Sequence, residues 1–347
     1  MKTILFCQNN YAFGILEPIR DVLKEHNYDY LWFVTKKISI NFPYDADNST
    51  SEISDLVAFK ADAIFAPGNE VPYYLRGLKV QIFHGLAGEK KGHFRIRHYF
   101  DLYLTQGPYF TRGFKKLNQK YKNFDVIETG WSKLDIYGKN NQKYNASKST
   151  LLQKHKAKKI LLYAPTFSPK LTSAPFLLDE FKHLAENTDY LILIKFHPLM
   201  AEDWIIKYKA LSNEVSNIIF QEEKNIIKFL LISDILISDT SSVIYEFLLL
   251  NKPVVTFKNI SKNINWEDSE DYSQLKSLVE KNLNQDPYAK KRDLVKKEYH
   301  PYDDGLSAER MVNVTKDYIK KNGVPSKRKL PFLRRLKIHS IFGKLPS

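Results

Sequence analysis

Short apolar runs alternate with longer amphipathic stretches along most of this chain of 347 residues, and this alternation constrains the fold more than any other feature. Runs such as Thr3 to Cys7 and Tyr190 to Phe196 are typical of buried strands, whereas Ile15 to Glu25 and Phe176 to Glu186 have helical periodicity. Strands separated by helices favour parallel sheets that are covered by helices on both faces. The sequence therefore predicts an α/β fold.

The strand candidates form two sets, one in each half of the chain. The first set is Thr3 to Cys7, Tyr30 to Val34, Ala63 to Ala66, Val80 to Phe83, Leu102 to Thr105 and Asp125 to Glu128. The second set is Ile160 to Ala164, Tyr190 to Phe196, Ile218 to Phe220, Ile235 to Ile237 and Val254 to Phe257. Because the chain is also too long for one typical core, we expect two doubly wound, Rossmann-like domains facing a cleft.

The domain boundary is expected between Tyr137 and Lys156, a stretch rich in Asn, Lys, Gln and Ser without apolar periodicity. We assign residues 1–145 to an N-terminal Rossmann-like domain and residues 155–300 to a C-terminal one. Residues 301–347 would form a C-terminal helix and a basic amphipathic tail. In open parallel sheets ligands bind beyond the carboxyl ends of the strands, so polar residues that follow the strands are the candidates for function.

The single cysteine, Cys7, excludes an internal disulfide and a cysteine-based zinc site. The apolar run at the N-terminus is too short for a signal peptide, and no run approaches the roughly 18 to 20 residues of a membrane span. We therefore expect a cytoplasmic protein. No acidic cluster marks a required metal, and we expect neither a metal site nor a cofactor.

A formal net charge of +14 indicates an anionic partner, which could be nucleic acid, an anionic membrane surface or a phosphorylated substrate. In residues 323–347 basic residues alternate with apolar ones, as in segments that lie on an anionic bilayer. The alternative is a solvated tail, or a helix packed back on the body through Leu333, Leu336 and Ile341. Aromatic residues fall mainly in apolar strand and helix patterns, which argues against a nucleic-acid-binding module.

An abrupt polar turn follows the predicted strand Ile235 to Ile237. It consists of Asp239, Thr240, Ser241 and Ser242, and an apolar helical pattern begins at Val243. Unpaired N–H groups at the start of a helix favour phosphate, and small hydroxyls can reach the same ligand. Helix capping alone is the other interpretation, since Asp and Ser are favoured there in any case.

Two histidines also follow strands. His84, together with Gly85 and a loop that contains Gly88, Lys90 and Lys91, comes after the strand predicted to end at Phe83. A neutral imidazole there can take a proton from a hydroxyl nucleophile. His197 precedes Pro198, which ends the strand and sets the chain direction, so its ring can donate to a phosphate oxygen. Taken singly, either histidine can instead be a turn residue.

Two further polar turns complete the set. Thr166 follows a strand in a Pro-Thr turn whose hydroxyl and N–H groups can bind phosphate or sugar hydroxyls. Asp304 and Gly305 lie in an acidic turn that opens a helix, where a simple helix cap is the alternative.

In combination, these turns resemble the motifs of the CDP-glycerol glycerophosphotransferase family, the GT-B-type teichoic acid primases and polymerases. The matching segments are His84-Gly85, Thr129 to Asp135, Leu162 to Thr166, Phe196 to Pro198, Ser233 to Pro253 and Asp304 to Arg310. The resemblance covers roughly two thirds of the chain. It implies transfer of glycerol phosphate, or a related alditol phosphate, from a CDP-linked donor to a hydroxyl in teichoic acid or capsule-type polymer synthesis, with release of CMP.

The resemblance also implies roles for single residues. His84 would be the catalytic base in an acceptor domain, and His197 would contact the donor pyrophosphate in a nucleotide-donor domain. Ser241 and Ser242 would bind the same phosphates, and Asp239 would orient their loop or meet donor hydroxyls. The remaining expected donor-binding residues are Gly85, Thr166, Thr240, Asp304 and Gly305.

The implied partners are a CDP-alditol donor, a lipid-linked or polymeric glycan acceptor and an anionic membrane surface bound by residues 323–347, with no nucleic acid. The enzyme would lie on the inner face of the cell membrane as a peripheral protein. The sequence departs from the family pattern after Gly85 and at Thr240, which leaves the alditol and the acceptor open. A nonhydrolysing UDP-GlcNAc 2-epimerase, which shares the two-domain architecture, is the alternative.

Overall fold

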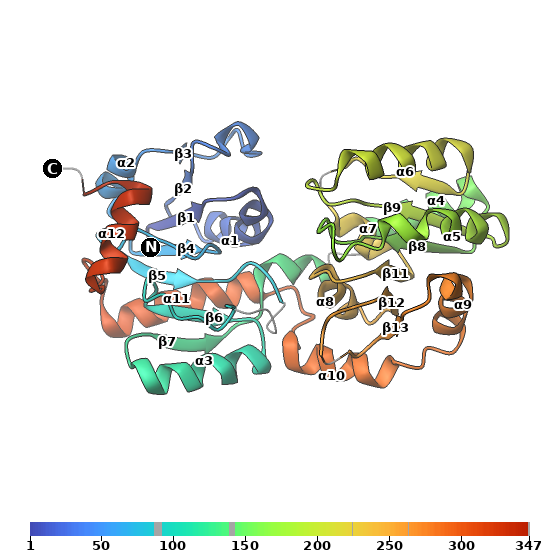
Figure 1. Ribbon diagram of the computed structural model, residues 1–347. Coiled ribbons are helices and arrows are strands. Elements are labelled where there is room, and N and C mark those ends of the chain that lie inside the picture. Colours follow the sequence, from blue (N-terminus) through green and yellow to red (C-terminus); the bar gives the residue numbers. More distant parts are fainter. Residues whose placement is uncertain (87–91, 139–142, 224, 263, 346–347) are drawn as a thin grey trace. The chain divides into compact units, whose positions relative to one another are not determined.

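The structure is a computed structural model that describes residues 1–86, 92–138, 143–223, 225–262 and 264–345. Its chain divides into two compact units (Figure 1). Unit 1 consists of Met1–Lys139 and Glu298–Ser347, and unit 2 consists of Asn140–Lys297. Residues 301–347, which we expected to lie apart from both domains, belong to unit 1. The chain thus returns to its first unit after completing the second.

Within the described residues, the sheet of unit 1 has seven strands in the order β3-β2-β1-β4-β5-β6-β7, and every pairing is parallel. The strands are β1 (Thr3–Cys7), β2 (Tyr30–Val34), β3 (Ser49–Thr50), β4 (Ala63–Ala66), β5 (Leu78–Gln81), β6 (Leu102–Thr105) and β7 (Asp125–Glu128). The strand predicted at Val80 to Phe83 begins and ends two residues earlier. It cannot extend to Phe83, because this residue has φ +58° and is not in the extended conformation.

Helices cover both faces of this sheet (Figure 1). They are α1 (Phe13–Glu25), α2 (Ile53–Phe59), α3 (Pro108–Tyr121), α11 (Ser307–Asn322) and α12 (Phe332–Phe342). Leu56 of α2, Phe114 of α3 and Ile338 of α12 share one hydrophobic cluster with Phe6 of β1. Helix α1 contacts α11 and the 3-10 helix η3 (Ser132–Tyr137).

Unit 2 repeats this plan with a second parallel sheet, whose described strands follow the order β10-β9-β8-β11-β12-β13. The strands are β8 (Lys159–Tyr163), β9 (Tyr190–Ile194), β10 (Ile218–Phe220), β11 (Ile235–Ser238), β12 (Val254–Phe257) and β13 (Glu267–Ser269). The helices are α4 (Lys143–His155), α5 (Ala174–Glu186), α6 (Glu202–Glu214), α7 (Ile227–Ile232), α8 (Val243–Leu248), α9 (Leu275–Asn284) and α10 (Ala289–Tyr299). The prediction of an α/β fold with two doubly wound sheets is confirmed.

The strand order reverses once in each sheet, and these switch points locate the ligand-binding edge of each unit. The reversal in unit 1 lies between β1 and β4, and the reversal in unit 2 lies between β8 and β11. In open parallel sheets the loops at the carboxyl ends of the strands diverge at such a point, which is where ligands bind. The turn from Asp239 to Ser242 follows β11, so it lies at the switch point of unit 2.

The C-terminal segment is anchored to unit 1 by Arg328, which is only 8% exposed. Its guanidinium pairs with Asp101 and donates to the carbonyl oxygens of His98 and Asn123 at 2.5 and 2.6 Å. A buried charge needs such partners. The described residues of this segment, 323–345, therefore do not form the free, solvated tail that was one expectation.

Helix α12 lies within this segment. It packs on the sheet through a different face from the one that the packed-helix alternative named. Ile338 is fully buried, and the ring of Phe342 lies 5.5 Å from that of Phe6. Leu333 and Leu336, which the packed-helix alternative placed against the body, are 77% and 48% exposed. In the described part of the chain, no helix combines the length and apolar character needed to cross a membrane.

Candidate functional site

His84 lies beyond the end of β5 with its imidazole exposed at the carboxyl edge of the unit 1 sheet. Its Nδ1 is 3.0 Å from the carbonyl oxygen of Pro67, which follows β4. A carbonyl oxygen only accepts hydrogen bonds, so Nδ1 carries the proton in the neutral ring. The bare lone pair is then on Nε2. The neighbouring loop thus fixes His84 in the tautomer that a proton acceptor requires.

Gly85 has a structural contact of its own. Its carbonyl oxygen accepts a hydrogen bond of 3.0 Å from Nε2 of Gln106, a buried side chain just after β6. This bond ties the His84 turn to the next strand of the sheet. The rest of the expected loop, with Gly88, Lys90 and Lys91, lies outside the described residues.

His197 lies at the carboxyl edge of unit 2 and has the opposite tautomer. The backbone N–H of Leu199 donates to its Nδ1 at 3.1 Å, so this nitrogen is the acceptor. In the neutral ring the proton is therefore on Nε2, which becomes a donor. Burial, and then the charge of Lys195, lower the pKa of His197, so the neutral ring is favoured. His197 can donate one hydrogen bond to an anion.

Asp239 is fully buried and organises the turn at the switch point. One carboxylate oxygen accepts from the backbone N–H groups of Thr166 and Thr240, at 2.8 and 2.6 Å. The other accepts from the N–H and the hydroxyl of Ser173, at 2.8 and 3.0 Å. Asp239 therefore joins the loop after β8 to the loop after β11. The two roles expected for Asp239 were orienting its loop and meeting donor hydroxyls. These hydrogen bonds are contacts of the first kind.

The hydroxyl-bearing residues around Asp239 are partly exposed. Ser241 Oγ accepts a hydrogen bond of 3.4 Å from the N–H of Val243, which is a weak cap. Ser242 precedes α8 directly and makes no side-chain capping bond. Thr240 Oγ1 accepts from the N–H of Ile260 at 3.3 Å. The Ser241 hydroxyl therefore caps α8, whereas the Ser242 hydroxyl does not. From the sequence, the two serines were assigned the same role.

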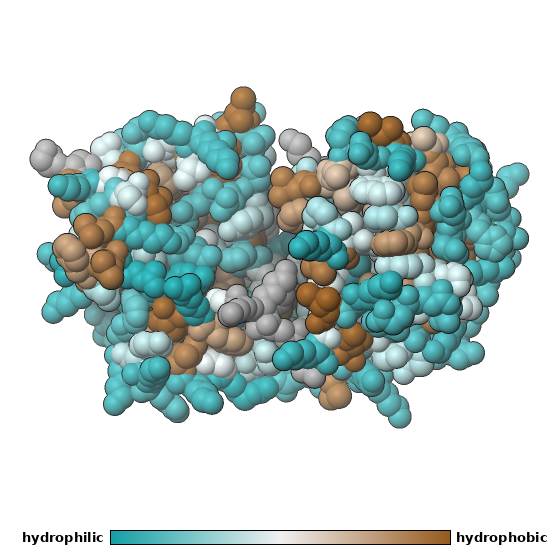
Figure 2. All heavy atoms as spheres, in the orientation of Figure 1, coloured by the Kyte–Doolittle hydropathy of each residue, from teal (hydrophilic) through white to brown (hydrophobic). Residues whose placement is uncertain are grey.

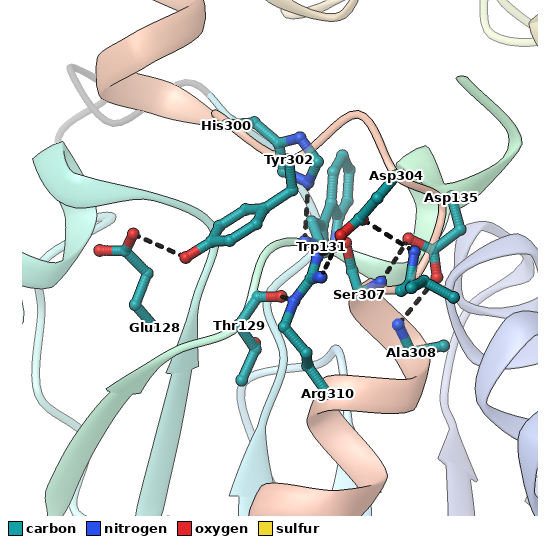
Figure 3. Close-up of polar contacts among 11 residues, drawn as sticks. Glu128, Thr129, Trp131, Asp135, His300, Tyr302, Asp304, Ser307, Ala308 and Arg310 are labelled. Carbon is teal, nitrogen blue, oxygen red and sulfur yellow. Dashed lines mark hydrogen bonds and ion pairs between the residues drawn. The ribbon is translucent and has the colours of Figure 1, made fainter. Parts of the chain in front are cut away.

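Asp304 and Gly305 belong to unit 1, where they form part of a joint with the loop after β7 (Figure 3). The Asp304 carboxylate accepts from both terminal nitrogens of Arg310, at 2.7 and 3.2 Å. This pairing lowers the pKa of Asp304, whose side chain remains 44% exposed. Gly305 has φ +74°, a conformation that favours glycine, and an added Cβ would lie 3.0 Å from the carbonyl oxygen of Asp135.

Asp135 links the loop after β7 to the start of α11. Its two carboxylate oxygens accept from the backbone N–H groups of Ser307 and Ala308, each at 2.8 Å, where α11 begins (Figure 3). A carboxylate at this end of a helix satisfies unpaired donors and complements the helix dipole. Asp135 lies in the motif Thr129 to Asp135, but its role could not be predicted, because its partners are more than 170 residues away in the chain.

Two more contacts hold the returning chain in place (Figure 3). The N–H of Trp131 donates to Nε2 of His300 at 2.9 Å, and the hydroxyl of Tyr302 donates to Glu128 at 2.9 Å. Burial lowers the pKa of His300 to about 4, so this ring is a neutral acceptor. The segments Thr129 to Asp135 and Asp304 to Arg310 are therefore two halves of one structural joint.

The architecture defines the class of the protein, which is the GT-B fold. The wall teichoic acid polymerase TagF has a TM-score of 0.67 at 19% identity, over 92% of this chain and 89% of that chain. The UDP-GlcNAc 2-epimerase from Neisseria meningitidis, solved bound to UDP-GlcNAc, has a TM-score of 0.63 at 13% identity, over 91% and 100% of the chains. These two structures share the fold with this chain.

The family is shown by the sequence. Residues 85–316, more than half of the chain, match the family described as CDP-Glycerol:Poly(glycerophosphate) glycerophosphotransferase, and the chain belongs to this family. The matched region begins one residue after His84. The resemblance stated from the motifs is therefore confirmed, and the epimerase has only the fold in common.

Relatives that are similar in sequence include teichoic acid primases and polymerases. The teichoic acid glycerol-phosphate primase of Bacillus subtilis (strain 168) is 30% identical over 186 residues, which cover 52% of this chain and 44% of that protein. The teichoic acid poly(ribitol-phosphate) polymerase of Bacillus spizizenii is 30% identical over 146 residues, which cover 38% and 22%. The chain thus spans less than half the length of these relatives.

Proposed function

We propose that this protein transfers glycerol phosphate, or a related alditol phosphate, from a CDP-linked donor to a hydroxyl of a cell-surface polymer or its lipid-linked precursor. The observation that carries the proposal is the pair of opposite tautomers. His84 has a bare Nε2 beyond its bond to Pro67, and His197 has a protonated Nε2 beyond its bond from Leu199. Group transfer to a hydroxyl needs one group of each kind.

In this reaction the acceptor oxygen forms a bond to the phosphorus of the alditol phosphate. The bond from that phosphorus to the bridging oxygen of the pyrophosphate breaks, and CMP leaves with the electron pair. The hydroxyl proton passes to Nε2 of His84. The Nε2–H of His197 donates to a donor phosphate oxygen and offsets the charge that develops there.

The remaining donor contacts come from the loops that Asp239 joins. The hydroxyls of Thr166, Ser241 and Ser242 and the first N–H groups of α8 bind the phosphates. Asp239 holds these loops together through its hydrogen bonds to the N–H groups of Thr166 and Ser173. Thr240 contributes mainly through its backbone. Asp304, which keeps an exposed edge, and Gly305 would meet the alditol or ribose end of the donor.

The identity of the alditol follows neither from the family nor from these loops. Among the similar proteins one is a glycerol-phosphate primase and another a poly(ribitol-phosphate) polymerase. Screening CDP-glycerol, CDP-ribitol and UDP-GlcNAc for thermal stabilisation separates the candidates, because a ligand that binds only the folded state raises the melting temperature. Stabilisation by UDP-GlcNAc alone would support the epimerase instead.

Substitution of His84 tests the catalytic part of the proposal. His84→Ala should lower CMP release by about 10²- to 10⁴-fold, the usual contribution of a general base, while CDP-alditol binding measured by calorimetry stays nearly unchanged. His197→Ala should instead weaken that binding by about 1 to 3 kcal/mol, since it removes a hydrogen bond to a charged group. His183→Ala, an exposed histidine on α5, is the control for both. Full turnover by His84→Ala would refute the assignment.

The second partner that we propose is the anionic inner face of the cell membrane, bound by α12. Figure 2 shows hydrophobic atoms gathered over this helix beside hydrophilic ones. Phe332, Leu333 and Leu336 are 69%, 77% and 48% exposed. Exposed basic residues surround them, namely Lys327, Lys329, Arg335 and Lys344. Apolar side chains that enter the headgroup region and cations that meet anionic lipids are the two requirements for such binding.

The membrane proposal is tested with surface substitutions, because removal of residues 323–347 would also uncover the core around Ile338. The variant Leu333→Gln/Leu336→Gln should bind vesicles of phosphatidylglycerol and phosphatidylcholine several-fold more weakly in a sedimentation assay. Leu294→Gln, at a 62% exposed position of α10, is the matched control. Equal vesicle binding by the double variant and the wild type would contradict the proposal.

A further inference from the structure

An exposed aromatic ring lies against His197. Phe167 follows Thr166 in the loop after β8, and its ring stacks on the His197 imidazole with centroids 4.5 Å apart and planes inclined by 29°. The two loops are neighbours because β8 and β9 pair in parallel, with Tyr163 opposite Ile194. Each ring therefore covers one face of the other at the carboxyl edge of the sheet.

Hydrophobic burial does not account for this position of Phe167. The residue is 40% exposed and lies outside the hydrophobic cluster that fills the α5 and α6 side of unit 2. A phenyl ring left this open to water gains less from burial than a core residue would. The ring that stacks on Phe167 is the imidazole of His197. The contact with His197 therefore explains the position of this ring better than burial does.

We propose that Phe167 is a positioning residue that holds the His197 imidazole in the orientation in which it donates to the donor phosphate. The proposal rests on the function proposed above. The N–H of Leu199 fixes which nitrogen of His197 faces the protein, at 3.1 Å. That hydrogen bond opposes rotation of the ring about its Cβ–Cγ bond, and the stack on Phe167 is a second restraint on the same rotation. The hydrogen bond and the stack together hold the Nε2–H group of His197 in one orientation.

The expected size of this effect follows from the energetics of aromatic pairs. Such pairs contribute beyond simple burial, and that contribution corresponds to about a 2- to 12-fold change in an equilibrium constant. Loss of the stack should weaken donor binding by this factor. The effect should be smaller than that of removing the imidazole itself, because Phe167→Ala leaves the hydrogen-bonding group in place.

Calorimetric binding of CDP-glycerol to a set of variants tests the proposal. Phe167→Ala should raise Kd by about 2- to 12-fold, and Phe167→Trp should restore it, whereas Phe167→Leu should not. In a His197→Ala background Phe167→Ala should have no further effect, because the residue acts through the imidazole. Phe176→Ala is the matched control: Phe176 is 55% exposed and stacks on Tyr272 with centroids 4.7 Å apart. An equal loss with and without His197 would overturn the proposal.

A second readout needs no ligand and separates this proposal from the proposed function. Nitrogen-15 NMR of the His197 ring should show a protonated Nε2 and a bare Nδ1 in the wild type. In Phe167→Ala the ring should turn away from the N–H of Leu199 for part of the time. Both tautomers are then populated, and the two nitrogen shifts should move towards each other. If neither CDP-glycerol nor CDP-ribitol binds the wild type or any variant, the proposed function fails, while this spectrum still tests Phe167. Identical spectra for the wild type and Phe167→Ala would overturn the positioning role.

Discussion

Replacement of Asp239 distinguishes a carboxylate that builds the site from one that contacts the ligand. In the structure the side chain is 0% exposed and accepts four hydrogen bonds, which come from Thr166, Ser173 and Thr240. Asp239→Ala removes all of these acceptors without removing a group that faces solvent. We therefore expect the variant to lose stability in unit 2 first and donor affinity only as a consequence.

The magnitude can be worked out bond by bond. The N–H of Ser173 is left buried without an acceptor, which costs about 1 to 3 kcal/mol. The N–H groups of Thr166 and Thr240 are partly buried and can reach water, so each costs about 0.5 to 1 kcal/mol. The Ser173 hydroxyl keeps Tyr163 as a partner. Removing a buried charge returns part of this sum. The net expectation is about 2 to 4 kcal/mol of destabilisation.

Hydrogen exchange followed by mass spectrometry is the suitable assay, because it reports on each unit separately. Peptides from β8, β11 and α5 should exchange faster in Asp239→Ala, and peptides from β1 and β4 should not change. Asp239→Asn, which keeps one acceptor oxygen, should lie between the variant and the wild type. A variant with normal exchange but no donor binding would refute the reasoning and make Asp239 a ligand contact.

The same residue predicts a pH dependence with a definite sign. Burial raises the pKa of Asp239 above its ordinary value of 3.8. Between these two pKa values the folded state binds more protons than the unfolded state, so stability rises as pH falls through the folded pKa. Relative to Asp239→Asn, unit 2 of the wild type should gain stability on acidification across this window. A constant difference between the two proteins would contradict the raised pKa.

Two predictions concern the joint in unit 1. Asp135→Ala should destabilise unit 1 by about 1 to 2 kcal/mol, because two N–H groups at the start of α11 lose a charged acceptor, and Asp135→Asn should recover part of this in urea unfolding. Arg310→Lys should lose the two-point pairing with Asp304 and cost less than about 1 kcal/mol. Since the pairing lowers the pKa of Asp304, its contribution is present above the unfolded pKa and is lost as pH falls through the folded one. The stability difference between wild type and Arg310→Lys should therefore shrink in acid.

The fold was largely predictable because its strands are apolar and buried on both faces. Eleven strand candidates correspond to strands of the structure, with shifts at their ends. The strands that sequence reasoning missed are β3 and β13, which lie at sheet edges and read as Ser-Thr and Glu-Asp-Ser. Edge strands of this composition carry no periodic apolar signal. The shift of β5 has a similar origin, since Lys79 is fully buried in it although lysine predicts a surface position.

The positions of the candidate-site loops in the fold were predictable from the sequence, whereas the contacts within those loops were not. The turn from Asp239 to Ser242 was identified from its place after a strand, and it lies at the switch point. Its internal bonds to Thr166 and Ser173 could not be read from sequence, because they depend on β8 and β11 being neighbours. The roles of Asp135 and His300 were missed for the same reason. Their partners come from the other end of unit 1 and carry no local pattern.

The two histidines illustrate most clearly what chain geometry adds to a sequence motif. In the sequence both are imidazoles that follow a strand, and nothing local distinguishes a proton acceptor from a donor. One backbone group makes the difference in each case: the carbonyl of Pro67 requires a proton on Nδ1 of His84, and the N–H of Leu199 excludes one from Nδ1 of His197. The chemical role of each ring is therefore set by the loop opposite it. Exchanging the donor and acceptor character of the two rings would require rebuilding those loops.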